Sequence, residues 1–170
     1  SYRGIKDWES VASEIFGNNC SILNLNKSYR TTIEITNNAN KVLRQMHLSE
    51  AEPVIRHGRE ILFEDFAKTD DYKVGKIKEW LDKGYKTIAV ICKTDKEAEV
   101  TYKSLSNCGI DITHIKASDV DYNGGVFVLT SALSKGLEFD AVLINDASSK
   151  VYDENNMDDM HLLYVAETRA

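Results

Sequence analysis

The feature that most constrains the fold of this chain is a series of short apolar runs that alternate with amphipathic segments. Thr87–Cys92 reads Thr-Ile-Ala-Val-Ile-Cys, and similar runs occupy Val126–Thr130 and Ala141–Asn145. An uninterrupted apolar run of this length is typical of a strand buried on both faces of a parallel sheet. Because segments with helical periodicity separate the runs, the sequence predicts an α/β domain with a mainly parallel sheet and helices on both faces.

Capping signals predict where the helices begin and end. Thr31-Thr32-Ile33-Glu34 is interpreted as a capping box with Thr31 as the N-cap and Glu34 reaching back, and Thr94 with Glu97 as a second one. A helix is expected over about Asp71–Lys83, ended by Gly84 and facing the core with Val74, Ile77 and Leu81. A last helix is expected over Asp158–Arg169. Further strands are expected at Ser21–Leu25, Val54–His57, Ile61–Phe66 and Ile110–Ile115, with a hairpin around Gly58.

Composition excludes several classes of protein. The chain has 170 residues, a net charge of −6 and no run of apolar residues long enough to span a membrane, so a single cytoplasmic domain is expected. Its cysteines, Cys20, Cys92 and Cys108, form no C-x-x-C pair, which argues against a zinc site. Because free-standing DNA-binding domains are usually basic, nucleic acid is expected to bind this chain weakly by itself. The first residue, Ser1, predicts a fragment of a longer protein.

The sequence contains no G-x-x-x-x-G-K-[ST] loop for a triphosphate. The segment Gly84-Tyr85-Lys86-Thr87 is only superficially similar, because it precedes a strand, whereas a phosphate loop follows a strand and opens a helix. No apolar strand ends in Asp-Glu, the pair that would hold magnesium. The chain is therefore expected to be unable to hold a metal–triphosphate complex alone.

Four segments carry chemistry: Ser1–Gly4, Asn26–Thr32, Leu129–Asp140 and His161–Ala170. Their sequences and their order resemble motifs of the UvrD/Rep-type superfamily 1 DNA helicases, and the resemblance covers essentially the whole chain. It implies a three-layer RecA-like domain, of the P-loop NTPase-like class, that is the second and C-terminal one of the enzyme. The stretch between Arg30 and Thr130 is too short for the large inserted domain of many members, and so is similar to the compact helicase IV/HelD-like branch.

The resemblance implies five residues at a nucleotide site. Tyr29 would stack on adenine, Glu138 would accept a hydrogen bond from the ribose, and Gly136 would allow a tight turn. Arg30 and Arg169 would reach the γ-phosphate, since a planar guanidinium matches phosphate oxygens bidentately. In such enzymes an arginine finger, the role implied for Arg169, is worth ~10³ to 10⁵ in rate.

The resemblance also implies contacts with a single strand. Tyr2 would stack on a base, which tolerates any sequence because every base has a π-face. The strand's backbone would be contacted by Thr130, Ser131 and Ser134, and Lys135 would either contact it too or brace the loop. The sequence departs from the family at Ala132, where many members carry histidine, and at Glu167, where a neutral residue is common.

These motifs predict the C-terminal motor domain of an ATP-dependent DNA helicase or translocase that is inactive alone. ATP and Mg²⁺ would bind only in the full-length protein, where an N-terminal RecA-like domain supplies the phosphate loop. Single-stranded or partly duplex DNA is the expected partner, with no membrane. Two alternatives stay open: an RNA polymerase-associated remodelling factor of the HelD type, and a degenerate, non-enzymatic protein-interaction domain.

Overall fold

The computed structural model describes residues 8–23, 26–54, 56–64, 70–116 and 124–170. Its central feature is a parallel four-stranded sheet in the order β4-β5-β3-β6. Strand β3 is buried over Ile88–Cys92, as expected for an interior strand with neighbours on both sides. The strands are β3 (Thr87–Cys92), β4 (Ile112–His114), β5 (Gly125–Thr130) and β6 (Ala141–Ile144).

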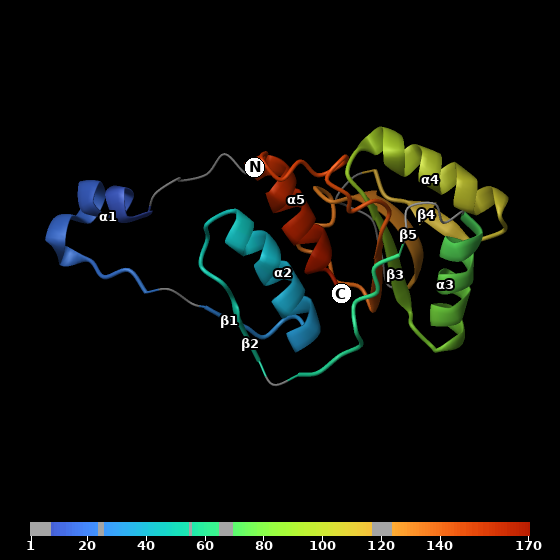
Figure 1. Cartoon of the computed structure of the whole chain (residues 1–170), viewed down its shortest axis with the longest axis horizontal. Coiled ribbons are helices and arrows are strands. Elements are labelled where there is room, and N and C mark those ends of the chain that lie inside the picture. The colour runs from blue at the N-terminus through green and yellow to red at the C-terminus, as the bar shows by residue number, and fades with distance from the viewer. Residues whose placement is uncertain (1–7, 24–25, 55, 65–69, 117–123) are drawn as a thin grey trace.

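Helices cover both faces of this sheet, which confirms the predicted three-layer arrangement (Figure 1). Helices α3 (Asp70–Asp82) and α4 (Asp95–Asn107) cover one face. Helix α5 (Met157–Glu167) covers the other, and α2 (Ile33–Gln45) packs against α5 on the side away from the sheet. Gly84, with a φ of +85°, ends the segment after α3 as the sequence predicts.

The two hydrophobic layers follow from the alternation of side chains along β3. Ile88 and Val90 belong to the cluster formed with α3 and α4, whereas Ala89 and Ile91 belong to the cluster on the α5 side. Leu81, expected in the core, is 41% exposed, and Trp80 packs on the core instead.

Helix α2 begins one residue later than its sequence suggests. Its N-cap is Thr32, whose Oγ1 accepts a hydrogen bond from the Ile35 amide at 3.4 Å. Thr31 is unavailable as a cap because its buried hydroxyl shares a hydrogen bond with Thr36 Oγ1 at 2.9 Å. Glu34 does not reach back along the helix either; its carboxylate accepts from the Gly58 amide at 2.8 Å.

These contacts also explain why the expected hairpin around Gly58 does not form. Arg56 O accepts from the Ile33 amide at 3.0 Å, and a Cβ at Gly58 would lie 2.5 Å from Thr32 Cγ2. The segment is thus held against the start of α2, and its described residues 56–64 contain no strand. The strand in this region is instead β2 (Glu52–Pro53), which pairs in parallel with β1 (Lys27–Ser28).

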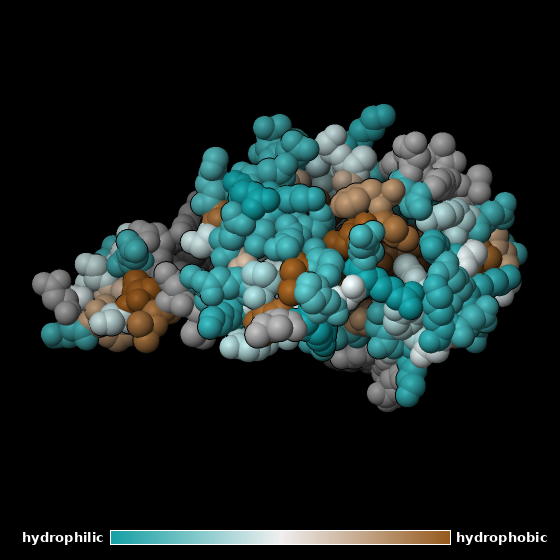
Figure 2. Space-filling model, turned by 60° about the horizontal axis from the view of Figure 1, so that its bottom comes forward, coloured by the Kyte–Doolittle hydropathy of each residue, from teal (hydrophilic) through white to brown (hydrophobic). Residues whose placement is uncertain are grey.

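The sequence gives no sign of the first helix, α1 (Trp8–Phe16), which the short 3₁₀ helix η1 (Gly17–Asn19) follows. In Figure 1, α1 stands away from the body of the molecule. Figure 2 shows apolar side chains at this end, where Ile15 and Phe16 are 66% and 61% exposed. No strand forms over residues 21–23, and residues 24 and 25 of the expected first strand lie outside the described residues.

Candidate functional site

The connection between β5 and β6, residues 131–140, passes over β3 from the carboxyl ends of the strands to their amino ends and is called the crossover below. Thr130 pairs with Cys92 at the end of β3, and Ala141 pairs with Ile88 near its start. At about 3.3 Å per residue, the two ends of the crossover are about 13 Å apart along the strands. Phe139 and the partly buried Leu133 and Leu137 hold it against the sheet.

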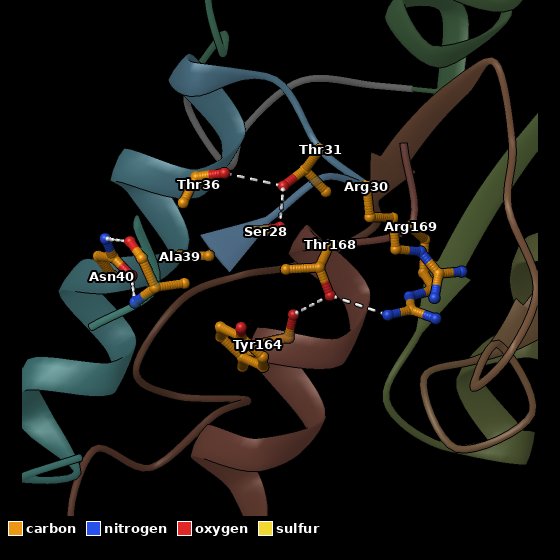
Figure 3. Close-up of a pocket in the computed structure, with 10 residues that line it drawn as sticks. Ser28, Arg30, Thr31, Thr36, Ala39, Asn40, Tyr164, Thr168 and Arg169 are labelled. Atoms are coloured by element: carbon orange, nitrogen blue, oxygen red, sulfur yellow. Dashed lines mark hydrogen bonds between the residues drawn. The ribbon is translucent and has the colours of Figure 1, made fainter. Parts of the chain in front are cut away.

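Two arginines from distant segments meet on this crossover. Arg30 Nη2 donates to the Leu137 carbonyl oxygen at 2.7 Å, and Arg169 Nη1 donates to the same oxygen at 3.4 Å. The Phe139 amide in turn donates to the Arg169 carbonyl at 2.9 Å. Figure 3 shows the two guanidinium groups side by side, one from the segment before α2 and one just after α5.

The residues around Arg30 lie at the surface. Arg30 forms an ion pair with Glu138 at 3.0 Å, and these side chains are 37% and 71% exposed. Tyr29 is 75% exposed. Gly136 has a φ of +89°, a region that favours glycine, and therefore supplies the predicted turn.

Arg169 is held more tightly, with 8% of its surface exposed. Its Nε donates to the Val165 carbonyl at 2.8 Å and its Nη2 to Thr168 Oγ1 at 3.0 Å. It thereby binds a carbonyl group in the last turn of α5, where a cation is favoured by the helix dipole. Contact with a phosphate would require part of this arrangement to open.

Both arginines line a cavity of about 130 Å³, whose lining residues Figure 3 draws. Its wall is mainly hydroxyl and amide groups from β1, α2 and the end of α5. Asn40 exchanges hydrogen bonds with the backbone of Ala51 at 2.9 Å in both directions, which fixes this wall. The lining residues are Ser28, Arg30, Thr31, Thr36, Ala39, Asn40, Ala51, Tyr164, Thr168 and Arg169.

The residues predicted to contact a single strand lie at the other end of the crossover. Ser131 and Ser134 are fully buried and Thr130 is 6% exposed. Ser131 Oγ shares a hydrogen bond with the Tyr152 hydroxyl at 2.9 Å, and Ser134 Oγ donates to the Ser131 carbonyl at 2.8 Å. In this structure both serine hydroxyls brace the crossover and do not face solvent. Lys135 is exposed, and Tyr2 lies outside the described residues.

Asp140, the last residue of the crossover, has a structural role that the motif alone does not indicate. Its Oδ2 accepts from the amides of Thr87 at 2.9 Å and Lys86 at 2.7 Å. The Thr87 bond is the larger cause of a pKa below the usual range for this carboxyl. Asp140 therefore ties the start of β6 to the start of β3.

Three residues that sequence reasoning missed surround the buried end of the crossover: Lys93, Tyr152 and Asp159. Lys93 Nζ donates to Asp159 Oδ2 at 2.6 Å and to the Val151 carbonyl at 2.5 Å. Lys93 could have been suspected, because it directly follows a buried strand at the carboxyl edge of the sheet. Tyr152 and Asp159 carry no comparable signal.

No group of three or more His, Cys, Asp or Glu side chains in the described ranges is arranged to hold a metal ion. Every helix in the same part of the chain is too short or too polar to cross a lipid bilayer.

Comparisons with known proteins show the family of this chain. A family model, the UvrD-like helicase C-terminal domain, matches residues 125–170, which include the crossover and α5. No curated protein matches the sequence. A similar solved structure is the C-terminal domain of a possible DNA helicase from Lactobacillus plantarum WCFS1, with a TM-score of 0.65 and 30% identity, covering 84% of this chain and 82% of that one. The chain therefore belongs to the family of UvrD-like helicase C-terminal domains.

Proposed function

We propose that this chain is the C-terminal motor domain of an ATP-dependent DNA helicase or translocase, and that it completes an ATP site together with an N-terminal RecA-like domain. The observation that carries the proposal is the meeting of Arg30 and Arg169 on one carbonyl oxygen, that of Leu137. Family membership supports the helicase assignment, and this convergence supports the nucleotide site.

A peptide carbonyl is a weak partner for two guanidinium groups. Phosphate oxygens carry formal charge and accept charge-assisted, bidentate hydrogen bonds, which are roughly twice as strong as neutral ones. A γ-phosphate at this point would therefore displace the Leu137 carbonyl as the shared acceptor. Arg30 would leave Glu138, and the freed carboxylate could accept a hydrogen bond from the ribose. The exposed ring of Tyr29 would stack on adenine.

Magnesium and the triphosphate loop would come from the N-terminal domain. The described residues offer no group of metal ligands, and the sequence has no phosphate loop. This chain would instead contribute cations to the transition state, where charge builds up on the transferred phosphoryl group. ATP binding would close the cleft between the domains and hydrolysis would reopen it, because only the triphosphate contacts both domains.

Nucleic acid would contact the other end of the crossover. Ala132 and Lys135 are exposed there, whereas the hydroxyls of Ser131 and Ser134 face the interior. We expect Lys135 and the backbone near Ala132 to contact the phosphates of a single strand, with the serines holding the loop in shape. The net charge of −6 fits a domain that binds DNA only together with a partner domain.

Substitution of the arginines in the intact protein tests this proposal. Arg30→Ala is expected to lower ATP turnover at least ~10²-fold, the scale of losing a group that stabilises transition-state charge. Arg169→Ala should do the same, but Arg169 is buried, so its variant also needs a thermal unfolding curve. The matched control is Arg44→Ala, which removes an exposed arginine of α2 that forms an ion pair with Glu50.

If Arg30→Ala hydrolysed ATP at the wild-type rate, Arg30 would not be the residue that contacts the γ-phosphate. An intact protein that binds no ATP and hydrolyses none would instead favour the degenerate protein-interaction domain.

A further inference from the structure

The buried end of the crossover is held by a tyrosine that no motif includes. Tyr152 lies in the loop after β6, is 1% exposed, and bonds Ser131 Oγ through its hydroxyl at 2.9 Å. Burial raises the pKa of Tyr152 to about 12, so the hydroxyl keeps its proton. The first residue of the crossover is thus bonded to a rigid, fully packed ring.

Tyr152 is itself fixed to the first turn of α5. Lys93 Nζ lies 5.6 Å from the centre of the Tyr152 ring, and it bonds both the Val151 carbonyl and Asp159 Oδ2. The same Asp159 oxygen accepts from the Asp153 amide at 3.0 Å. The residues on both sides of Tyr152 are therefore held to Asp159.

The far end of the crossover is held by the opposite end of the same helix. Arg169, just beyond α5, accepts from the Phe139 amide and donates to the Leu137 carbonyl. The ends of the crossover lie about 13 Å apart along the strands and, because β3 separates β5 from β6, about 9.5 Å apart across them, which makes about 16 Å in all. An α-helix of 11 residues is also about 16 Å long. One helix therefore clamps the crossover at both ends.

We propose that the crossover and α5 move as one body and that Tyr152 is the positioning residue that joins them at the strand-contacting end. A strand that contacts the region of Ala132 and Lys135 would shift Ser131, and the Tyr152 link would pass that shift through α5 to Arg169. Tyr152 contacts neither nucleotide nor strand. The effect on ATP turnover rests on the proposed function. The link between Ser131 and Arg169 through Tyr152 can be measured without it.

Tyr152→Phe in the intact protein removes one hydroxyl and keeps the ring. The first measurement is hydrogen exchange of the Phe139 amide, at the far end of the crossover. We expect exchange there to become about fivefold faster, the factor that corresponds to the loss of one buried hydrogen bond. The matched control is Tyr102→Phe, on α4 at the opposite face of the sheet, and it should leave Phe139 unchanged.

A double-mutant cycle with Ser131→Ala separates the bond from general loosening. If the Ser131–Tyr152 bond is the link, the double variant should exchange no faster at Phe139 than either single variant. Additive effects, or an unchanged Phe139 in Tyr152→Phe, would overturn the proposal.

The second measurement is the ratio of strand-stimulated to basal ATP turnover, which should fall at least threefold in Tyr152→Phe and stay at the wild-type value in Tyr102→Phe. Faster exchange with an unchanged ratio would overturn the role in coupling. A wild-type protein whose ATPase does not respond to a strand would contradict the proposed function, while the exchange experiment would still decide whether the crossover and α5 form one body.

Discussion

Glu167 is an acidic side chain that the fold partly buries in the last turn of α5, two residues before Arg169. Its Oε1 accepts from Asn38 Nδ2 at 3.0 Å, and its Oε2 is buried without a hydrogen-bond partner among the described residues. Burial raises the pKa of Glu167 to about 7, although the charge of Lys41 and the Asn38 bond act in the opposite direction. The carboxyl group is therefore about half protonated at neutral pH.

This pKa predicts that the protein loses stability as the solution becomes more alkaline. A carboxyl group that titrates near 4.5 when unfolded and near 7 when folded stabilises the fold fully below pH 4.5, and this contribution is lost as pH rises to about 7. Glu167→Gln keeps the hydrogen bond and removes the charge. Between pH 5 and pH 8 the wild type should lose about 2 kcal/mol of unfolding free energy relative to this variant.

Denaturant unfolding at the two pH values measures the difference, with Glu14→Gln on the exposed surface of α1 as the control. If the wild type and Glu167→Gln lost the same unfolding free energy between pH 5 and pH 8, the pKa of Glu167 would not be raised in the folded protein and the prediction would be wrong.

The N-cap of α4 is Thr94, and its contribution to stability can be predicted for this helix alone. Thr94 Oγ1 accepts from the Glu97 amide at 3.2 Å, while the Glu97 carboxylate accepts from the amide of Lys93 at 2.9 Å. Thr94→Ala should cost about 1 kcal/mol of unfolding free energy, the usual value of a lost cap. Ser106→Ala, on the exposed face of the same helix, should be neutral or slightly stabilising, since alanine has the higher helix propensity. A thermal or urea unfolding series compares the two.

Elements with a strong local signal could be predicted from the sequence. Strand β3 matches its apolar run at both ends, and α3 and β5 match within a residue, because apolar runs mark the two strands and Gly84 marks the end of the helix. The start of α2 could not be predicted, since Thr31 is taken up by a tertiary contact with Thr36. The expected hairpin failed for the same reason: its backbone bonds go to a helix that is distant in sequence.

The candidate site could be predicted as far as its motifs reach. The sequence indicates that Arg30 and Arg169 belong together, and the structure brings them to one oxygen. The sequence could not indicate which side chains of the crossover face inward, so it did not predict the burial of Ser131 and Ser134. The roles of these residues, the HelD-like branch and a polymerase partner stay predictions.

At the scale of the whole molecule, we expect residues 1–170 alone to hydrolyse no ATP. The chain offers arginines to a phosphate but has no phosphate loop, and its described residues include no group of metal ligands. Phosphate release with excess Mg·ATP should therefore equal the background of a buffer control, while the intact protein turns over. Robust turnover by purified 1–170, after contaminating enzymes are removed, would contradict the domain assignment.

The arginine pair on the Leu137 carbonyl also bears on how different anions reach the domain. Arg30 and Arg169 share that carbonyl, and Arg30 alone pairs with the Glu138 carboxylate, so two guanidinium groups meet one carboxylate on a chain whose net charge is −6. Beyond a Debye length of about 8 Å at physiological salt, an approaching molecule experiences little of this local charge. We expect a long polymer of phosphates, which would extend past the two arginines, to be repelled by the net negative charge of the chain, whereas a compact polyphosphate would contact the arginines alone. On this argument a nucleotide is the expected ligand of the arginine pair, in preference to a nucleic acid.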